Sequence, residues 1–174
     1  MKTYGTEPGA PTPVQVGISE LAVSEGDDTI KSYGLGSCLA IALYDSDSDI
    51  GGLAHTMLPD GDAAENSDVK PGKYADTAIR ALLRRMVERG ATYTSVEAKI
   101  AGGSDMFEFE SFGDGVGQRN IAAAKAELEK LGVPLVAEDV GGEHGRTVEF
   151  TPGTGTLVVK TGSDSVEGNG VTEL

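Results

Sequence analysis

The chain has 174 residues, with 14 Lys and Arg against 28 Asp and Glu, so its formal net charge is −14. Such an acidic protein repels the phosphate backbone of nucleic acids, which excludes nucleic acid as a partner. The single cysteine, Cys38, excludes an internal disulfide. No apolar run reaches the roughly 18 residues that a membrane-spanning helix needs. We therefore expect a cytoplasmic protein with no direct membrane insertion.

The same charge suggests adaptation to a cytoplasm that holds molar salt. Salt screens the repulsion between like charges that would otherwise destabilise a compact acidic chain. Our hypothesis is that the protein is halophilic, and an ordinary acidic protein is the alternative. Unfolding on dilution from molar KCl into low salt distinguishes the two.

The two ends of the chain differ in composition from its middle. Residues 1–13 contain three Pro, and residues 161–174 are polar, Gly-rich and acidic. Such segments bury too little apolar surface to offset the entropy lost on ordering. We predict a flexible N-terminal tail over 1–13, one domain over 14–160 and a flexible acidic C-terminal tail over 161–174.

The first part of the domain is predicted to be β-structure. Apolar residues alternate across residues 14–23, which predicts one or two short strands. The continuous apolar run over 39–44 is typical of a buried strand. After the turn DSDSD, residues 50–58 can run back beside it, so we predict a hairpin.

Two helices are predicted further along. Apolar residues recur at spacings of three and one over residues 73–89, as on one face of a helix, and Gly90 ends this helix. A second helix is predicted over 116–131, with Asn120 as a cap and Gly132 at its end.

Short apolar segments between and after the helices supply the remaining strands, which we predict at residues 96–101, 135–140, 147–150 and 156–160. Strands and helices in this order indicate an α/β fold with a mixed β-sheet covered by helices.

Several familiar motifs are incomplete. Gly34 and Gly36 begin a dinucleotide-binding pattern, but the third Gly is missing and a strand follows. Asp45, Asp47 and Asp49 resemble the start of a calcium loop that lacks its later Gly and Glu. One Cys and two distant His cannot form a zinc-ligand set of normal spacing. The sequence therefore predicts no metal and no cofactor.

Cys38 and His55 lie on the two strands of the predicted hairpin, where antiparallel pairing brings them together. A cysteine beside an imidazole can form a thiolate–imidazolium pair and act as a nucleophile. The neighbouring Gly36, Ser37, Gly51 and Gly52 are candidates for substrate binding or for backbone N–H donors to an oxyanion. The residues alone leave a second interpretation open, in which Cys38 is a small buried apolar residue and His55 is structural.

At these residues the chain also resembles a known family. The segments that carry the resemblance are GLGSCLAIALYD, GGLAHTMLP, KYADTAI, AKIAGGSDMF, GQRN, DVGGEHGRTVEF and TGTLVV. In this order, over about residues 14–160, they resemble the chemoreceptor glutamine deamidase family, CheD. The acidic composition further suggests a haloarchaeal member.

The resemblance implies an α/β fold, a mixed β-sheet sandwich with two main helices, similar to the catalytic domain of deamidating toxins. It implies hydrolysis of glutamine side chains to glutamate on methyl-accepting chemotaxis receptors, and in some members hydrolysis of receptor glutamyl methyl esters. Cys38 is then the nucleophile and His55 the base. Ser32 occupies the place of a family Thr that completes the site, and Ser has more rotamer freedom than Thr.

The resemblance also implies partners, namely the cytoplasmic region of the receptors and a CheC-type phosphatase. The alternative function is a non-catalytic chemotaxis adaptor that binds both. We expect His144 in a surface loop, whereas Met106 and Phe107 are either core or docking residues. Arg119 and Asn120 match the family, but capping and ion pairing explain them as well as substrate contact does.

Overall fold

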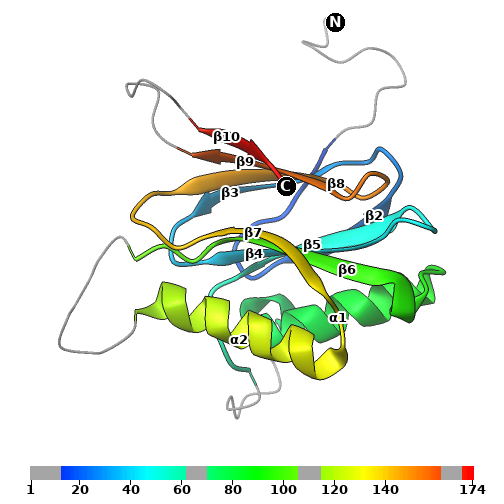
Figure 1. Cartoon of the computed structure of the whole chain (residues 1–174), viewed down its shortest axis with the longest axis horizontal. Helices are drawn as coiled ribbons and strands as arrows, with labels where there is room; N and C mark the ends of the chain where they lie inside the picture. The colour runs from blue at the N-terminus through cyan, green and yellow to red at the C-terminus, as the bar shows by residue number, and fades with distance from the viewer. Residues whose placement is uncertain (1–12, 62–69, 106–114, 162–169) are drawn as a thin grey trace, which may run out of the picture.

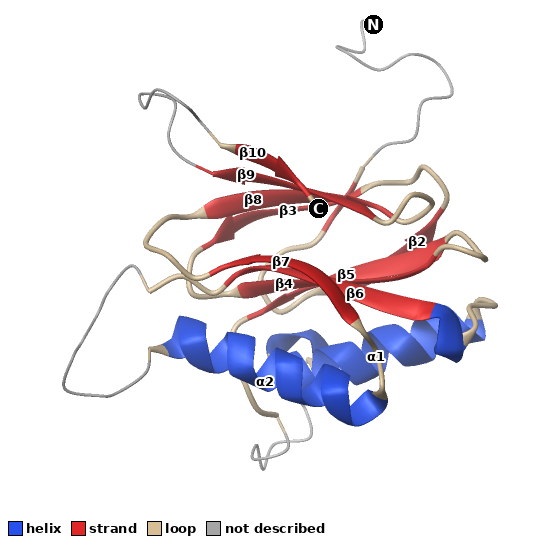
Figure 2. Ribbon diagram, in the orientation of Figure 1, coloured by secondary structure: helices blue, strands red, loops and turns tan. Residues whose placement is uncertain are grey.

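The computed structural model describes residues 13–61, 70–105, 115–161 and 170–174. These residues form three stacked layers: one β-sheet, a second β-sheet, and two helices on the outer face of the second sheet (Figures 1 and 2). The predicted α/β class, a mixed sandwich with two main helices, is confirmed. The helices cover one face of one sheet only, because the other face packs against the first sheet.

Each sheet has five strands. The first sheet has the order β1-β3-β8-β9-β10, formed by β1 (Val14–Gln15), β3 (Ile30–Leu35), β8 (Arg146–Thr151), β9 (Thr156–Thr161) and β10 (Val171–Glu173). The second has the order β2-β5-β4-β6-β7, formed by β2 (Leu21–Glu25), β5 (Ile50–Thr56), β4 (Leu39–Asp45), β6 (Val96–Gly102) and β7 (Leu135–Val140). Both sheets are mixed, since β1 pairs in parallel with β3 and β6 with β7.

The helices follow their predicted apolar stripes. α1 (Ala75–Glu88) follows the short 3-10 helix η1 (Pro71–Lys73), and α2 (Val116–Leu131) follows β6 and a second short turn, η2 (Tyr93–Ser95). α2 ends as predicted at Gly132, whose φ of 73° suits a glycine. The prediction that Asn120 caps α2 is wrong: the cap position is Gly115, and Asn120 lies buried inside the helix.

Two hydrophobic layers lie on opposite faces of the second sheet. Alternate side chains of β4 point to opposite faces, so Leu39, Ile41 and Leu43 pack toward the helices. Ala40 and Ala42 instead pack toward the first sheet. The two layers share strands, and each combines alanines with large apolar side chains.

Two strands were not predicted. β3 escapes a search for alternating apolar residues because its buried positions include Ser32 and its sequence includes Gly34. β10 lies within the expected C-terminal tail, where it pairs antiparallel with β9, and Leu174 exchanges two backbone hydrogen bonds with Leu157. Residues 170–174 of the expected C-terminal tail thus pair with the first sheet, and Thr161 is the last residue of β9. Residues 1–12 and 162–169 of the expected tails lie outside the described ranges.

Candidate active site

The hairpin places Cys38 and His55 on the same face of the second sheet. β4 and β5 pair antiparallel, with Ala40 opposite His55. Cys38 precedes β4 directly and packs against the layer between the sheets, on the same side as Ala40. Cys38 and His55 are therefore diagonal neighbours, because Ala40 and not Cys38 stands directly opposite His55. Diagonal neighbours in an antiparallel pair lie farther apart than opposite ones, within reach of a long or aromatic side chain such as histidine.

Ser32 reaches His55 from the facing sheet. Its Oγ lies 2.7 Å from His55 Nδ1 and 2.6 Å from the carbonyl oxygen of Val16. Ser32 and His55 are fully buried. A carbonyl can only accept, so the hydroxyl proton goes to Val16 and Nδ1–H donates to Ser32 Oγ. We assign this tautomer, which leaves a lone pair on His55 Nε2.

That Nε2 atom is buried and has no hydrogen-bond partner within the described residues. A buried nitrogen without a partner costs free energy unless a group missing from the resting structure uses it. The unpartnered lone pair is suited to accept a proton.

The segment before β2 makes hydrogen bonds to both His55 and Ser32. The main-chain N–H of Ser19 donates to the His55 carbonyl at 2.8 Å, and the His55 N–H donates to the Glu20 carbonyl at 3.0 Å. Together with the Val16 carbonyl, residues 16–20 fix both the backbone of His55 and the hydroxyl of Ser32. No sequence motif indicates this role, because the groups involved are main-chain atoms.

Burial keeps the Cys38 thiol and the His55 imidazole uncharged. It raises the pKa of Cys38 above the ordinary thiol value, an effect that a hydrogen bond from the residue's own backbone N–H partly offsets. It lowers the pKa of His55 to about 4. At neutral pH the resting form is therefore a thiol and a neutral imidazole, in contrast to the thiolate–imidazolium pair expected from the sequence.

In the loop that carries Cys38, three successive carbonyls each accept a hydrogen bond. The Gly36 carbonyl accepts from the Ser104 N–H and the Cys38 carbonyl from the Gly103 N–H, each at 2.9 Å. The Ser37 carbonyl accepts from Asn120 Nδ2 at 2.8 Å. In a trans peptide the N–H points opposite to the C=O. The N–H groups of Ser37 and Cys38 therefore point away from these donors.

The structure gives Gly51 and Gly52 a packing role instead of the predicted oxyanion or substrate role. Both lie at the turn end of β5, far along the hairpin from Cys38. A Cβ on Gly51 would come within 2.9 Å of the Phe150 ring, and one on Gly52 within 2.7 Å of Leu82. Larger residues do not fit because both faces of β5 are covered here.

The other candidates named from the sequence do not belong to the buried Ser32–His55 pair. His144 and Arg119 are exposed, and Met106 and Phe107 fall outside the described ranges. Within the described part of the chain, no three His, Cys, Asp or Glu side chains converge as a metal-binding group. No helix there is long and apolar enough to cross a membrane.

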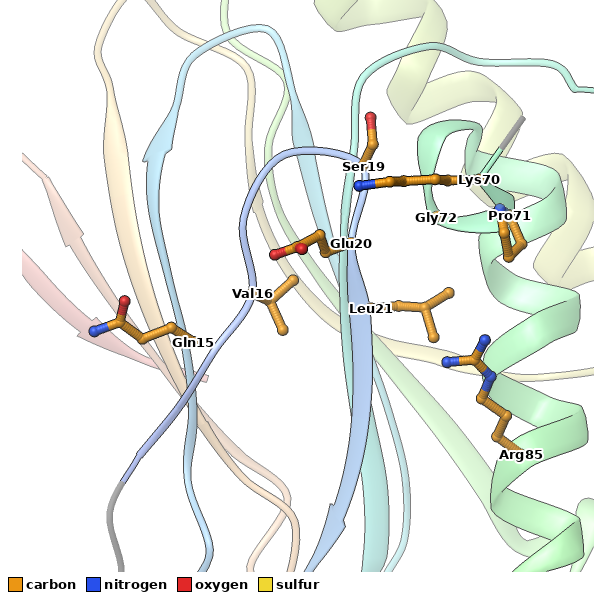
Figure 3. A pocket seen from close by; sticks show the side chains of 9 residues that line it. All are labelled: Gln15, Val16, Ser19, Glu20, Leu21, Lys70, Pro71, Gly72 and Arg85. Carbon is orange, nitrogen blue, oxygen red and sulfur yellow. The ribbon is translucent and has the colours of Figure 1, made fainter. Parts of the chain in front are cut away.

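A cavity of about 300 Å³ lies beside Val16, Ser19 and Glu20 of segment 16–20 (Figure 3). Lys70 and Arg85 line it from the helical side, and Glu20 lines it from the strand side. Neither Cys38 nor His55 belongs to its lining. The cavity and the Ser32–His55 pair thus share a wall but are separate features.

The fold and the site define a class of protein: an α/β sandwich of two mixed sheets that encloses a hydrogen-bonded Ser–His pair beside a lone cysteine. The family model described as CheD chemotactic sensory transduction matches residues 57–161. This range begins just after His55, so the match does not include Ser32, Cys38 or His55.

Curated relatives extend the similarity over most of the chain. A protein of Halalkalibacterium halodurans named "Chemoreceptor glutamine deamidase CheD" is 45% identical, over 85% of this chain and 93% of its own length. The Bacillus subtilis protein of the same name is 39% identical, over 85% and 90%. A Haloarcula marismortui protein named "Probable chemoreceptor glutamine deamidase CheD" is 42% identical, over 95% of both chains. The chain belongs to the CheD family.

Proposed function

We propose that this protein hydrolyses glutamine side-chain amides of chemoreceptors to glutamates, with Cys38 as nucleophile and His55 as base. The names of the relatives support the reaction and the receptor substrate. The observation that carries the chemistry is the 2.7 Å contact between Ser32 Oγ and His55 Nδ1, because it leaves the Nε2 lone pair free to take a proton. The cytoplasmic region of a receptor is the substrate, so the protein acts in the cytoplasm.

The first half-reaction starts from the uncharged pair. His55 Nε2 removes the thiol proton as Cys38 Sγ attacks the amide carbon. The N–H groups of Ser37 and Cys38 donate to the developing oxyanion. Ser32 steadies the imidazolium, since Nδ1–H keeps its hydrogen bond to Ser32 Oγ. The imidazolium then gives its Nε2 proton to the departing nitrogen, so ammonia leaves and a thioester remains on Cys38.

The second half-reaction restores the enzyme. His55 Nε2 takes a proton from water, the hydroxide attacks the thioester carbon, and the C–S bond breaks. The thiolate of Cys38 recovers the proton from His55. The products are a receptor glutamate and the free thiol, and the overall change consumes one water and releases one ammonia.

A receptor cytoplasmic fragment incubated with the protein in molar KCl tests this proposal. We expect mass spectrometry to show conversion of specific Gln residues to Glu, and Cys38→Ala to abolish it while the melting temperature stays near that of the wild type. Activity that persists in Cys38→Ala would show that the nucleophile is wrong. No conversion on any receptor of the host would favour the non-catalytic adaptor.

The same route accepts a glutamyl methyl ester, with methanol in place of ammonia as the leaving group. We include receptor methyl ester hydrolysis in the proposal on this chemical ground, and methanol release from a methylated receptor fragment measures it. Equal methanol release with and without the protein would remove the ester from its substrates.

A CheC-type phosphatase is the further proposed partner, and it rests on the family resemblance. Light scattering on a mixture of the two purified proteins in molar KCl tests whether they form a complex. The receptor deamidation rate with added phosphatase shows whether this partner competes with the receptor. Two unchanged particle sizes on mixing would exclude the complex.

A further inference from the structure

Asn120 is an uncharged polar side chain buried in the second turn of α2. It is fully buried, and the other buried residues of this helix include the apolar Ile121, Ala124 and Leu128. An amide in such surroundings costs free energy unless its hydrogen bonds are made. The polar contacts of Asn120 therefore indicate why an amide stands there.

Both hydrogen bonds from Asn120 go to the backbone on either side of the candidate site. Its Nδ2 donates to the Ser37 carbonyl at 2.8 Å and to the Met57 carbonyl at 3.1 Å. Ser37 directly precedes Cys38, and Met57 follows His55 by two residues. Both acceptors are carbonyls, so the NH₂ group must face them. One side chain thus ties the nucleophile loop to the end of the strand that carries His55.

The amide oxygen supports the same assignment. Asn120 Oδ1 is buried and has no hydrogen-bond partner within the described residues. The side chain therefore satisfies its two donors at the expense of its acceptor. Its orientation is set by the two backbone carbonyls.

We propose that Asn120 is a positioning residue, which sets the distance and angle between Cys38 Sγ and His55 Nε2. This inference deepens the proposed function and rests on it for its effect on turnover. Asn120 also holds the Ser37 carbonyl inward, and the N–H of Cys38, on the same peptide, consequently points outward to the oxyanion. Displacing a reacting group by about 1 Å can cost about a hundredfold in rate.

Asn120→Asp tests the inference most directly, because it keeps the shape of the side chain and removes both donors. A carboxylate there also repels the two carbonyl oxygens. Asn120→Ser is the second variant, since it adds no charge and its single, shorter donor cannot hold both carbonyls. Gln118→Glu is the matched control: it makes the same amide-to-carboxylate change at an exposed position of the same helix.

We expect kcat on a receptor fragment to fall by about tenfold to a hundredfold in the Asn120 variants that remain folded, with KM changed much less. Gln118→Glu should retain wild-type kcat. The melting temperature of each variant shows whether it is folded at the assay temperature. Wild-type kcat in a folded Asn120 variant would overturn the inference.

The second readout needs no deamidation. The rate of Cys38 alkylation by iodoacetamide is measured against pH for the wild type, His55→Gln, Asn120→Ser and the double variant. We expect His55→Gln to change the rate and its pH profile in the wild-type background and to have no further effect when Asn120 is Ser. An equal effect of His55→Gln in both backgrounds, or none in either, would overturn the inference.

The two readouts separate the two hypotheses. A wild-type protein that deamidates no receptor but shows the expected alkylation cycle would refute the proposed function and keep Asn120 as a positioning residue. If the wild type deamidates receptors but His55→Gln changes Cys38 alkylation equally with Asn or Ser at position 120, the positioning role alone is refuted.

Discussion

The second sheet separates two interior layers of different character. On its helix side, large apolar side chains such as Leu82 and Met86 fill the space between α1 and the strands. On its other side, the layer between the sheets contains Ala40, Ala42 and Ala101 on β4 and β6, together with large side chains such as Phe150 and Leu157. The same layer contains the buried pair Ser32 and His55.

The difference indicates a division of labour. Large buried side chains contribute most of the free energy of folding, because each removes much apolar surface from water. Small side chains beside His55 contribute less, and they leave room for an imidazole and its hydrogen-bond partner. We therefore expect changes in the helix-side layer to alter stability and changes at Ser32 and His55, between the sheets, to alter chemistry.

Replacing His55 should produce the largest effect. His55→Gln removes the base, so we expect the deamidation rate to fall by about 10²–10⁴-fold. His144→Gln is the matched control, because His144 is the only other histidine and is exposed. Receptor mass spectrometry measures both. A similar loss in the two variants would contradict the assignment of the base.

Leu82→Ala tests the opposite layer. Leu82 is fully buried against the second sheet, so its truncation should lower the free energy of unfolding by about 2–5 kcal/mol. Turnover per folded molecule should stay unchanged. Val87→Ala, at an exposed position of the same helix, should cost less than about 0.5 kcal/mol. Denaturant titration measures the free energies of unfolding. A changed pH profile of turnover in Leu82→Ala would show that the helix-side layer also affects the chemistry.

Acid should weaken the layer between the sheets through His55. Its pKa is about 4 in the folded protein, below the ordinary histidine value, so the unfolded chain binds the proton more tightly. Above about pH 6.5, His55 is neutral in both states, and the free energy of unfolding keeps its full value. As the pH falls from 6.5 toward 4, protonation of His55 in the unfolded chain lowers that free energy by at most about 3 kcal/mol in all. Unfolding at several pH values should show this slope in the wild type and in His144→Gln. The slope should be reduced in His55→Gln, and an unchanged slope there would assign it to other groups.

Removing the Ser32 hydroxyl should slow the reaction less than removing the His55 imidazole. Ser32→Ala deletes one hydrogen bond to an imidazole that becomes charged, which corresponds to a rate loss of about tenfold to a hundredfold. Ser24→Ala is the control, because Ser24 is also buried and donates to the Asp28 carbonyl, away from the site. A rate for Ser32→Ala equal to that of the control would mean that Ser32 does not orient His55.

The secondary structure was predictable where local pattern decides it. Each helix carries an apolar repeat, and the hairpin has a continuous apolar run followed by a turn, so local patterns identify all three. β3 and β10 have no such local pattern. They form strands because they pair with β8 and β9, which lie elsewhere in the chain. Ser32 of β3 was therefore identified only through the family resemblance.

The site divides in the same way. The sequence by itself determined that Cys38 and His55 belong to one hairpin, since a short turn fixes which residues of two strands can meet. Only the tertiary structure decided that Ser32 and the Val16 carbonyl set the tautomer of His55. It also decided that Asn120 is buried and bonded to the Ser37 and Met57 carbonyls, and does not cap α2. These contacts join different sheets or a helix and a loop, and no local periodicity specifies the register between elements so far apart in the chain.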